Sequence, residues 1–400
     1  MNRTLFFAVA PVMAVAGLAG FVSKPVAPVV QSAADGQTEA VVVAARAFIN
    51  SLSVEQQKAV QFPSAVQPKA TAATFTGSRG GGRGDQGARG GTDRGGNRGD
   101  AGRGGPGGGM FGGFVGEQYG QAVWSNFPVS DVPRPGVTIG SLSADQRTSA
   151  IHLLQVLLSD KGYQKVLDIM GSDQALADGG TQFSSGTAFY TLGIFGTPST
   201  SAPWMLQFGG HHLGLNLTIV GAHGVITPTL TGAQPAVYTA NGKTIRVLAQ
   251  ENDKAFTLLN ALDAAQQRQA MLNYRIGDLV FGPGQDGKTI APEGLKASLM
   301  TDAQRAMLID LIAEWAGIVN DVYAAGRLSE IKAGLPDTYF AWSGPATHDA
   351  NRNGTAYYRI QGPKLLIEFS PQGVGGDPTM HVHTMYRDPT NDYGRAFISR

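Results

Sequence analysis

The spacing of apolar residues and the capping signals in front of them divide the chain into helical and extended stretches. Four stretches start with a capping box, in which a hydroxyl or carboxylate side chain and a glutamine three residues later bond each other's backbone N–H groups. The four pairs are Ser53 with Gln56, Ser143 with Gln146, Asp263 with Gln266, and Thr301 with Gln304. Apolar residues at helical spacing follow, clearest over 304–325, and a further apolar-rich helix is predicted over 39–50.

Extended stretches make up much of the remaining chain. They are predicted at 204–220, 225–231, 357–361, 364–370 and 379–387, separated by Gly, Pro and polar turns. Runs of strands between runs of helices predict an α+β fold: a single domain with a mainly antiparallel sheet and helices packed on one face. The similarity between 51–56 and 141–146 is explained by shared capping chemistry rather than by a repeat.

Two segments stand apart from this domain. Residues 1–34 have a short basic start, an uncharged apolar run over 5–22 and small residues near 32–34, which is typical of a cleaved signal peptide; an uncleaved anchor is the alternative. Residues 77–113 are rich in Gly and Arg and have no apolar periodicity, which indicates a flexible, disordered insertion. We therefore expect a helical part at 35–76, a main α+β body at 114–400, and a periplasmic or secreted location.

Composition excludes several kinds of function. The 400 residues include 31 basic and 30 acidic ones, so the chain as a whole is not built to bind nucleic acid or an anionic membrane surface. The absence of cysteine excludes disulfides, thiol catalysis and cysteine-ligated metals. Residues 282–289 match the phosphate-loop pattern, but a poor helix former follows, so we expect a surface turn and no nucleotide.

The histidines carry the candidate chemistry. His381 and His383 have the H-x-H spacing that places two imidazoles on one face of a strand, where they can ligate a metal. In the pair His211 and His212, strand alternation assigns His212 to the site and His211 to the core, and a bulge at 209–210 would exchange them. His212 is therefore a candidate third ligand, with His211 as its substitute.

Charged residues on the neighbouring strands complete the candidate site. Glu368 lies among apolar residues and is a candidate fourth ligand or general base, with Arg359 as its expected partner. Arg387, on the same face as the H-x-H pair, is a candidate clamp for an anionic substrate, as is Arg359. Asp392 is expected to have a structural role in the turn that follows.

The C-terminal motifs also resemble a known family. FGGHHLGLN, PTLTGAQPA, YYRIQGPKLLIEF and HVHTMYRDPTNDYG are similar to those of the bacterial and fungal domain of unknown function 3500, and the resemblance spans 38–394 apart from the insertion. It supports a single domain and brings no established activity. The residues it marks as characteristic are Trp204, His211, His212, Asn216, Tyr358, Arg359, Glu368, His381, His383, Arg387, Asp388, Asp392 and Tyr393.

These observations lead to one main functional prediction and two alternatives. The main prediction is a metal-dependent enzyme, a hydrolase before an oxidoreductase, with zinc, copper, iron or manganese and a small-molecule or anionic substrate. The alternatives are a non-catalytic protein that binds a metal or a small ligand, and a metal-free hydrolase with a histidine base.

Overall fold

The structure, a computed structural model, describes residues 32–75, 114–181 and 183–398. The described residues from Ala33 onward belong to one compact unit. The predicted signal segment up to residue 31 and the predicted insertion at 77–113 lie outside the described residues. Among the helices described, none combines the length and apolar character needed to cross a membrane.

Helices and strands alternate in blocks along the described chain. The α-helices are α1 (Ala33–Ser51), α2 (Val54–Val60), α3 (Ala144–Leu157), α4 (Asp160–Asp178), α5 (Ala249–Ala261), α6 (Ala264–Ala270), α7 (Asp302–Ala316), α8 (Asp321–Ala333) and α9 (Arg395–Ile398). Short 3-10 helices are η1 (Ile139–Ser141), η2 (Thr187–Phe189), η3 (Ala297–Leu299), η4 (Leu335–Asp337) and η5 (Asp392–Gly394).

One large sheet contains most of the strands. Its path is β1 (Gln61–Phe62), β6 (Thr191–Phe195), β7 (Trp204–Gly210), β8 (Leu213–Val220), β10 (Thr229–Ala233), β17 (Val382–Arg387), β16 (Leu365–Pro371), β15 (Tyr357–Gly362), β14 (Tyr339–Ser343) and β13 (Leu295–Lys296). β5 (Val137–Thr138) and β9 (His223–Val225) pair with β6 and β8. Smaller sheets are formed by β2 (Thr71–Phe75), β3 (Phe114–Tyr119) and β4 (Ala122–Trp124), and by β11 (Val237–Ala240) and β12 (Lys243–Arg246). All pairings within the large sheet are antiparallel except that of β1 with β6, which confirms the predicted α+β fold.

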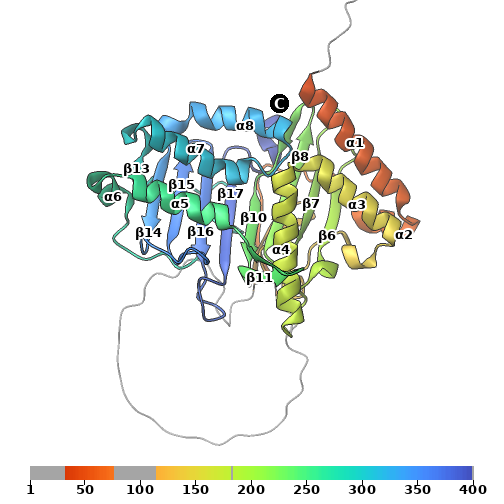
Figure 1. The fold of residues 1–400 in the computed structure, drawn as a ribbon. Coiled ribbons are helices and arrows are strands. Elements are labelled where there is room, and N and C mark those ends of the chain that lie inside the picture. Colours follow the sequence, from red (N-terminus) through yellow and green to blue (C-terminus); the bar gives the residue numbers. More distant parts are fainter. Residues whose placement is uncertain (1–31, 76–113, 182, 399–400) are drawn as a thin grey trace, which may run out of the picture. The chain divides into compact units, whose positions relative to one another are not determined.

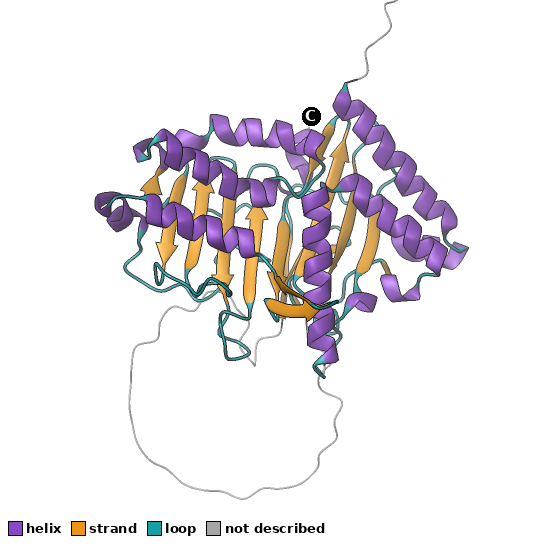
Figure 2. Ribbon diagram, in the orientation of Figure 1, coloured by secondary structure: helices purple, strands orange, loops and turns teal. Residues whose placement is uncertain are grey.

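The helices cover one face of the large sheet (Figures 1 and 2). In Figure 1, α5 and α7 lie across β14 to β17, while α1, α3 and α4 lie across β6 to β10. On β17 this face carries Thr384, whose hydroxyl accepts a hydrogen bond of 3.0 Å from the Trp315 indole. The alternate residues of β17 therefore point to the opposite face, and there Met385 packs with Trp124 and Phe281 in a separate apolar cluster.

The two halves of the described chain repeat the same order of elements. Apart from β1 to β4 and β9, which have no counterpart, the series α1, α2, β5, η1, α3, α4, η2, β6, β7, β8, β10 is matched by α5, α6, β13, η3, α7, α8, η4, β14, β15, β16, β17. The strand order of the sheet is correspondingly mirrored about the β10–β17 pair. Residues 51–56 and 141–146, which resemble each other in sequence, are not equivalent positions of this repeat; both belong to its first half.

Four predicted elements are divided in the structure. The helix predicted over 304–325 ends at Ala316 as α7, and a second helix, α8, begins at Asp321. The strand predicted over 225–231 is divided between the end of β9 and the start of β10. The helical stretch after Ser143 breaks at Leu158, and Ser159 caps a new helix by accepting a hydrogen bond of 3.0 Å from Gly162 N. The stretch 204–220 is a hairpin rather than one strand, because His211 and His212 form the turn between β7 and β8. The helix expected over 39–50 is confirmed as the longer α1.

All four predicted capping boxes form, and their glutamines pair across helices. The Gln146 side chain donates to Ser51 O at 3.0 Å and to Gln56 Oε1 at 2.8 Å. In the second half Gln304 makes the equivalent bonds to Ala261 O and Gln266 Oε1, at 2.8 and 2.9 Å. Each pair of amides thus joins the starts of two helices.

We expect Gln146→Ala to lower the free energy of unfolding of the full chain by about 1–3 kcal/mol, because it removes a cap and two hydrogen bonds to the neighbouring helix. Gln164→Ala is the matched control: Gln164 is also helical, but its amide bonds only Asp168 at the surface. Urea denaturation measures both. Equal stabilities of the two variants would contradict the role of the amide pair.

Candidate metal centre

Three histidines from the two halves of the sheet meet at one point. His212 comes from the β7–β8 turn, His381 precedes β17 and His383 lies within it. β10 runs between these elements, and its Gly232 lies opposite His383 in the register. A Cβ at position 232 would come within 3.3 Å of the His212 ring and 2.7 Å of Val382 O, so glycine leaves the room that the cluster needs.

The Nε2 atoms of the three rings converge. His212 Nε2 lies 3.0 Å from His381 Nε2, which lies 3.1 Å from His383 Nε2. One ligand atom of each ring lies within 4.8 Å of those of the other two. Nitrogen ligands of a tetrahedral zinc ion at 2.0–2.1 Å are separated by about 3.3 Å, so this spacing suits a shared metal. We call His212, His381 and His383 the histidine cluster.

The Nδ1 atoms of the three rings, which point away from the centre of the cluster, have different surroundings. His381 Nδ1 donates to Val374 O at 2.8 Å, so its Nε2 carries a lone pair that faces the cluster. His383 Nδ1 lies 3.1 Å from the Asn126 amide nitrogen and 3.7 Å from Asp278 Oδ1. The Asn126 side chain can bond either tautomer of His383: its NH2 group can donate to Nδ1, and after a 180° rotation of the amide its oxygen can accept from Nδ1–H. His212 Nδ1 is buried and has no hydrogen-bond partner among the described residues.

Burial favours the neutral form of His212 and His381. Burial and the nearby His383 ring lower the pKa of His381 to about 3. Burial, followed by the neighbouring His211, His381 and His383 rings, holds the pKa of His212 well below its ordinary value. The neutral imidazole is the form that ligates a metal, so these two rings can bind one without first releasing a proton.

The backbone of His212 is strained. Its φ of 60° lies in the left-handed region, which costs a non-glycine residue about 1–2 kcal/mol. Gly or Asn is the usual residue at such a turn position. A non-glycine residue in this backbone conformation, with a side chain that faces two other histidines, is typical of a functional site.

His211 lies beside the histidine cluster and is not a member of it. Its Nδ1 bonds Asp173 Oδ1 at 2.9 Å, and its ring stacks on that of His212 with centroids 3.7 Å apart. The prediction that His212 rather than His211 faces the site agrees with this placement. The reason is the two-residue turn, not strand alternation, because neither histidine lies in a strand.

The carboxylate of Glu368 bonds groups outside the histidine cluster. It is fully buried and accepts hydrogen bonds from Val280 N at 3.0 Å, Phe281 N at 2.8 Å and the Tyr357 hydroxyl. Burial raises its pKa, although these hydrogen bonds oppose the rise. Glu368 thus holds the 280–281 segment against the sheet, and the structure does not bring it into the histidine cluster.

Arg359 lies directly opposite Glu368 in the strand register, but the expected side-chain pair does not form. Its guanidinium bonds Glu293 Oε2 at 2.7 Å and donates to the Tyr357 hydroxyl at 3.3 Å. Tyr357 therefore links the two charged groups, and Arg359 points to Glu293 near the surface rather than to the histidines.

Arg387 has every N–H of its guanidinium bonded. The group also lies over the Trp124 ring, 4.5 Å from its centroid. Its acceptors are Phe281 O at 2.8 Å, Gly282 O at 3.0 Å, Asp392 Oδ2 at 2.8 Å and both carboxylate oxygens of Glu117. No donor remains for an anionic substrate, so the contacts are those of a buried structural network. The structural role expected for Asp392 agrees with its place in this network.

Several residues of the site were not identified from the sequence. Asn126 and Asp278 come from segments without a regular pattern, so no signal marked them. Asp173 had a signal: it lies on the buried stripe of α4 together with Val166 and Ile169, where a carboxylate requires a partner. Gly232 lies within β10 and carried no signal of its own.

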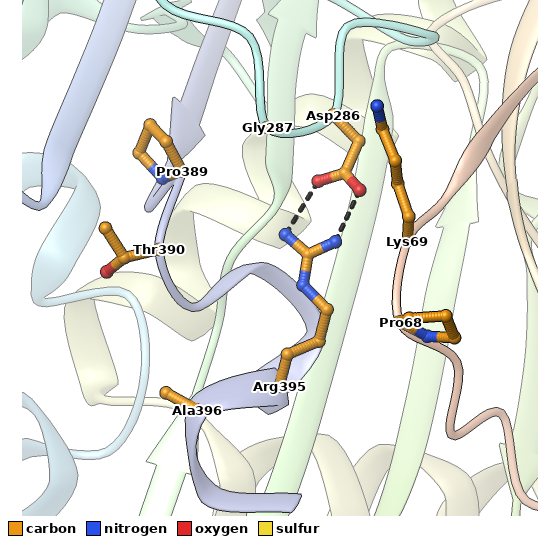
Figure 3. A pocket seen from close by; sticks show the side chains of 8 residues that line it. All are labelled: Pro68, Lys69, Asp286, Gly287, Pro389, Thr390, Arg395 and Ala396. Atoms are coloured by element: carbon orange, nitrogen blue, oxygen red, sulfur yellow. Dashed lines mark hydrogen bonds and ion pairs between the residues drawn. The ribbon is translucent and has the colours of Figure 1, made fainter. Parts of the chain in front are cut away.

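The phosphate-loop match is a surface turn, as expected, and no helix directly follows it in the described chain. Its Asp286 anchors the C-terminal segment, accepting from Arg395 Nη2 at 2.8 Å and from Ala70 N at 2.8 Å. Figure 3 shows this ion pair in a pocket that Lys69 also lines. The pocket contains none of the cluster histidines.

Comparison with family models places residues 115–395 in the family described as "Protein of unknown function (DUF3500)". Searches among curated proteins and among solved structures gave no match. The matched range contains the whole histidine cluster and the residues that hold it, and it confirms the resemblance drawn from the motifs. The chain therefore belongs to the DUF3500 family.

Proposed function

We propose that this protein is a metal-dependent enzyme whose metal is held by His212, His381 and His383, and that the reaction is a hydrolysis. The observation that carries the proposal is the convergence of three imidazole nitrogens, with no fourth protein ligand among the described residues. Structural zinc sites have four protein ligands, whereas catalytic sites have three and keep a position for water or substrate.

The ligand set favours zinc or copper. Three imidazoles without a thiolate or carboxylate suit zinc, copper and, less well, iron, whereas manganese prefers oxygen ligands. Val374 O fixes the tautomer of His381 from outside, as carbonyl groups do for metal-ligating histidines. This choice refines the wider set of metals expected from the sequence.

The chain supplies the positioning for such a reaction. A bound zinc ion would supply a Lewis acid that lowers the pKa of water to near neutrality. His381 and His383 are fixed by β17 and by their outer hydrogen bonds, and His212 by the turn. His383 is the cluster member with some exposure, and beside it Asp278 has a side chain 37 % exposed. Substrate is therefore proposed to enter past Asp278 and Asn126, and no role is assigned to Glu368, Arg359 or Arg387.

Burial of the ligands favours one second candidate, a non-catalytic metal-binding protein. His212 and His381 are 2 % and 7 % exposed, which suits retention of a metal as well as catalysis. Exchange of a metal-bound water for a small ligand separates the two functions: an enzyme site exchanges it, and a closed site does not. Export from the cytoplasm, indicated by residues 1–34, is part of the proposal for either function.

Metal content tests the proposal directly. The full chain, purified without a histidine tag, is expected to hold close to one zinc or copper per molecule by elemental mass spectrometry. The double variant His381→Ala, His383→Ala is expected to hold none while remaining folded by circular dichroism. His152→Ala, which changes a helical histidine outside the cluster, is the control and should keep the metal. A parent chain that stays metal-free after dialysis against these ions would sink the proposal.

Relief of the strain at His212 gives a second test. We expect His212→Asn to leave the metal-free protein as stable as the parent, or to stabilise it by up to about 1 kcal/mol, because Asn accepts positive φ. The same change should weaken metal binding at least 100-fold, since it removes one of three ligands. Thermal unfolding with and without zinc measures both effects. A variant that is destabilised and still binds zinc would contradict the assignment of His212.

The lowered pKa values predict metal retention in acid. Only the deprotonated imidazole binds a metal, so affinity falls as the pH drops through the pKa of each ligand, which is about 6.5 for an ordinary histidine. Because burial lowers the pKa of His381 to about 3 and that of His212 well below the ordinary value, zinc should stay bound at pH 5 and leave toward pH 3. Zinc content after dialysis at successive pH values measures this. Half-release near pH 6 would show an ordinary, exposed histidine site.

A further inference from the structure

The three ligands of the proposed centre differ in what orients them, and His212 is the exception. His381 is held by a carbonyl and His383 by an amide, but His212 Nδ1 has no hydrogen-bond partner among the described residues. Its backbone also lies in the left-handed region, in a turn of only two residues. Something other than a hydrogen bond of its own must therefore keep its ring directed at the centre.

The ring of His211 is the group packed against His212. The two rings stack with centroids 3.7 Å apart and planes 29° from parallel. His211 is itself fixed on several sides: Tyr190 donates to its carbonyl at 3.0 Å, and Phe183 meets its ring edge to face at 5.2 Å. The orientation of His212 thus depends on that of His211.

Asp173 fixes the ring of His211. Its Oδ1 accepts from His211 Nδ1 at 2.9 Å, and its Oδ2 accepts from Gly186 N at 2.9 Å. Both side chains are buried, with exposures of 1 % for Asp173 and 5 % for His211. Because each carboxylate oxygen accepts from its own donor, the orientation of the Asp173 carboxylate is fixed. The bond to His211 also joins α4 to the β7–β8 turn, which carries His212.

We propose that Asp173 and His211 are positioning residues of the metal centre, which direct the His212 ring through the stacked His211 ring. This inference rests on the proposed metal site and adds to it a support that contacts no metal. It also gives the histidine pair of the sequence two distinct roles: His212 binds, and His211 orients.

Asp173→Asn separates this role from general stability. An amide has one acceptor oxygen and one donor nitrogen, so an Asn that still accepts from Gly186 N can only donate to His211 Nδ1. His211 then loses its charged acceptor and must change tautomer, which weakens the contact that orients its ring. Asp178→Asn is the matched control, because Asp178 ends the same helix at the surface and accepts only from Gln174. His211→Asn is the second variant; it removes the stacked ring but retains a donor toward Asp173.

The probe is cobalt(II), titrated into the full-length parent and each variant in competition with a chelator. We expect Asp173→Asn and His211→Asn each to weaken cobalt binding 10- to 100-fold and to change the visible absorption spectrum at saturation, with Asp178→Asn unchanged. The double variant should bind no more weakly than the weaker single variant, since both act through one ring. The spectrum reports ligand geometry, which a loss of stability alone would not alter.

Binding and spectra within two-fold of the parent in both variants would overturn the positioning role while leaving the metal site in place. If Asp173→Asn does not fold, His211→Asn decides the question alone. A parent that binds no cobalt would instead overturn the proposed function, and the positioning role with it.

Discussion

The pairing of β10 with β17 is the contact on which both the fold and the site depend. It joins the two repeated halves into one sheet, through five registered residue pairs from Thr229 with Tyr386 to Ala233 with Val382. The hydroxyls of Thr231 and Thr384 meet across this pair at 2.6 Å, on the face that the helices cover. On the other face, the same pairing sets His383 beside Gly232 and within reach of the turn that carries His212.

The two faces of the sheet bury different kinds of side chain. The helix-covered face buries a continuous apolar core, in which packing is the main constraint. The other face carries Arg359, Glu368 and Arg387, charged groups that are almost completely buried. Segments outside the large sheet supply their partners: Glu293, the backbone of 280–282, and Glu117 on β3. Removing one member of such a network costs more than its net contribution to stability, because the other charge is left buried without a partner.

Sequence reasoning succeeded where the signal is local. The capping boxes, the convergence of the H-x-H pair at the start of β17 and the hairpin around Gly362 depend on neighbouring residues, and all three were predicted. Sequence reasoning failed where a loop or turn determines the contacts of a residue. Glu368 was correctly identified as needing a partner, but the backbone of Val280 and Phe281, which bonds it, lies far along the chain, and no periodic pattern marks this segment. The turn at His211 and His212 was hidden because its strands continue the same apolar pattern on both sides, and a histidine at positive φ is not a usual turn signal.

The mirrored order of the sheet does not extend to the chemistry. At the position equivalent to His211 and His212, the second half has Pro363 and Lys364 in the turn between β15 and β16. The histidine cluster therefore takes one member from the first half and two from the second, and neither half holds all three. During synthesis of the chain, the N-terminal half alone offers only His212 of the three cluster histidines, too few to retain a metal at this point. At the proposed metal site, binding of an ion would require that the last strand has joined the sheet, and a bound ion would then report the completion of folding.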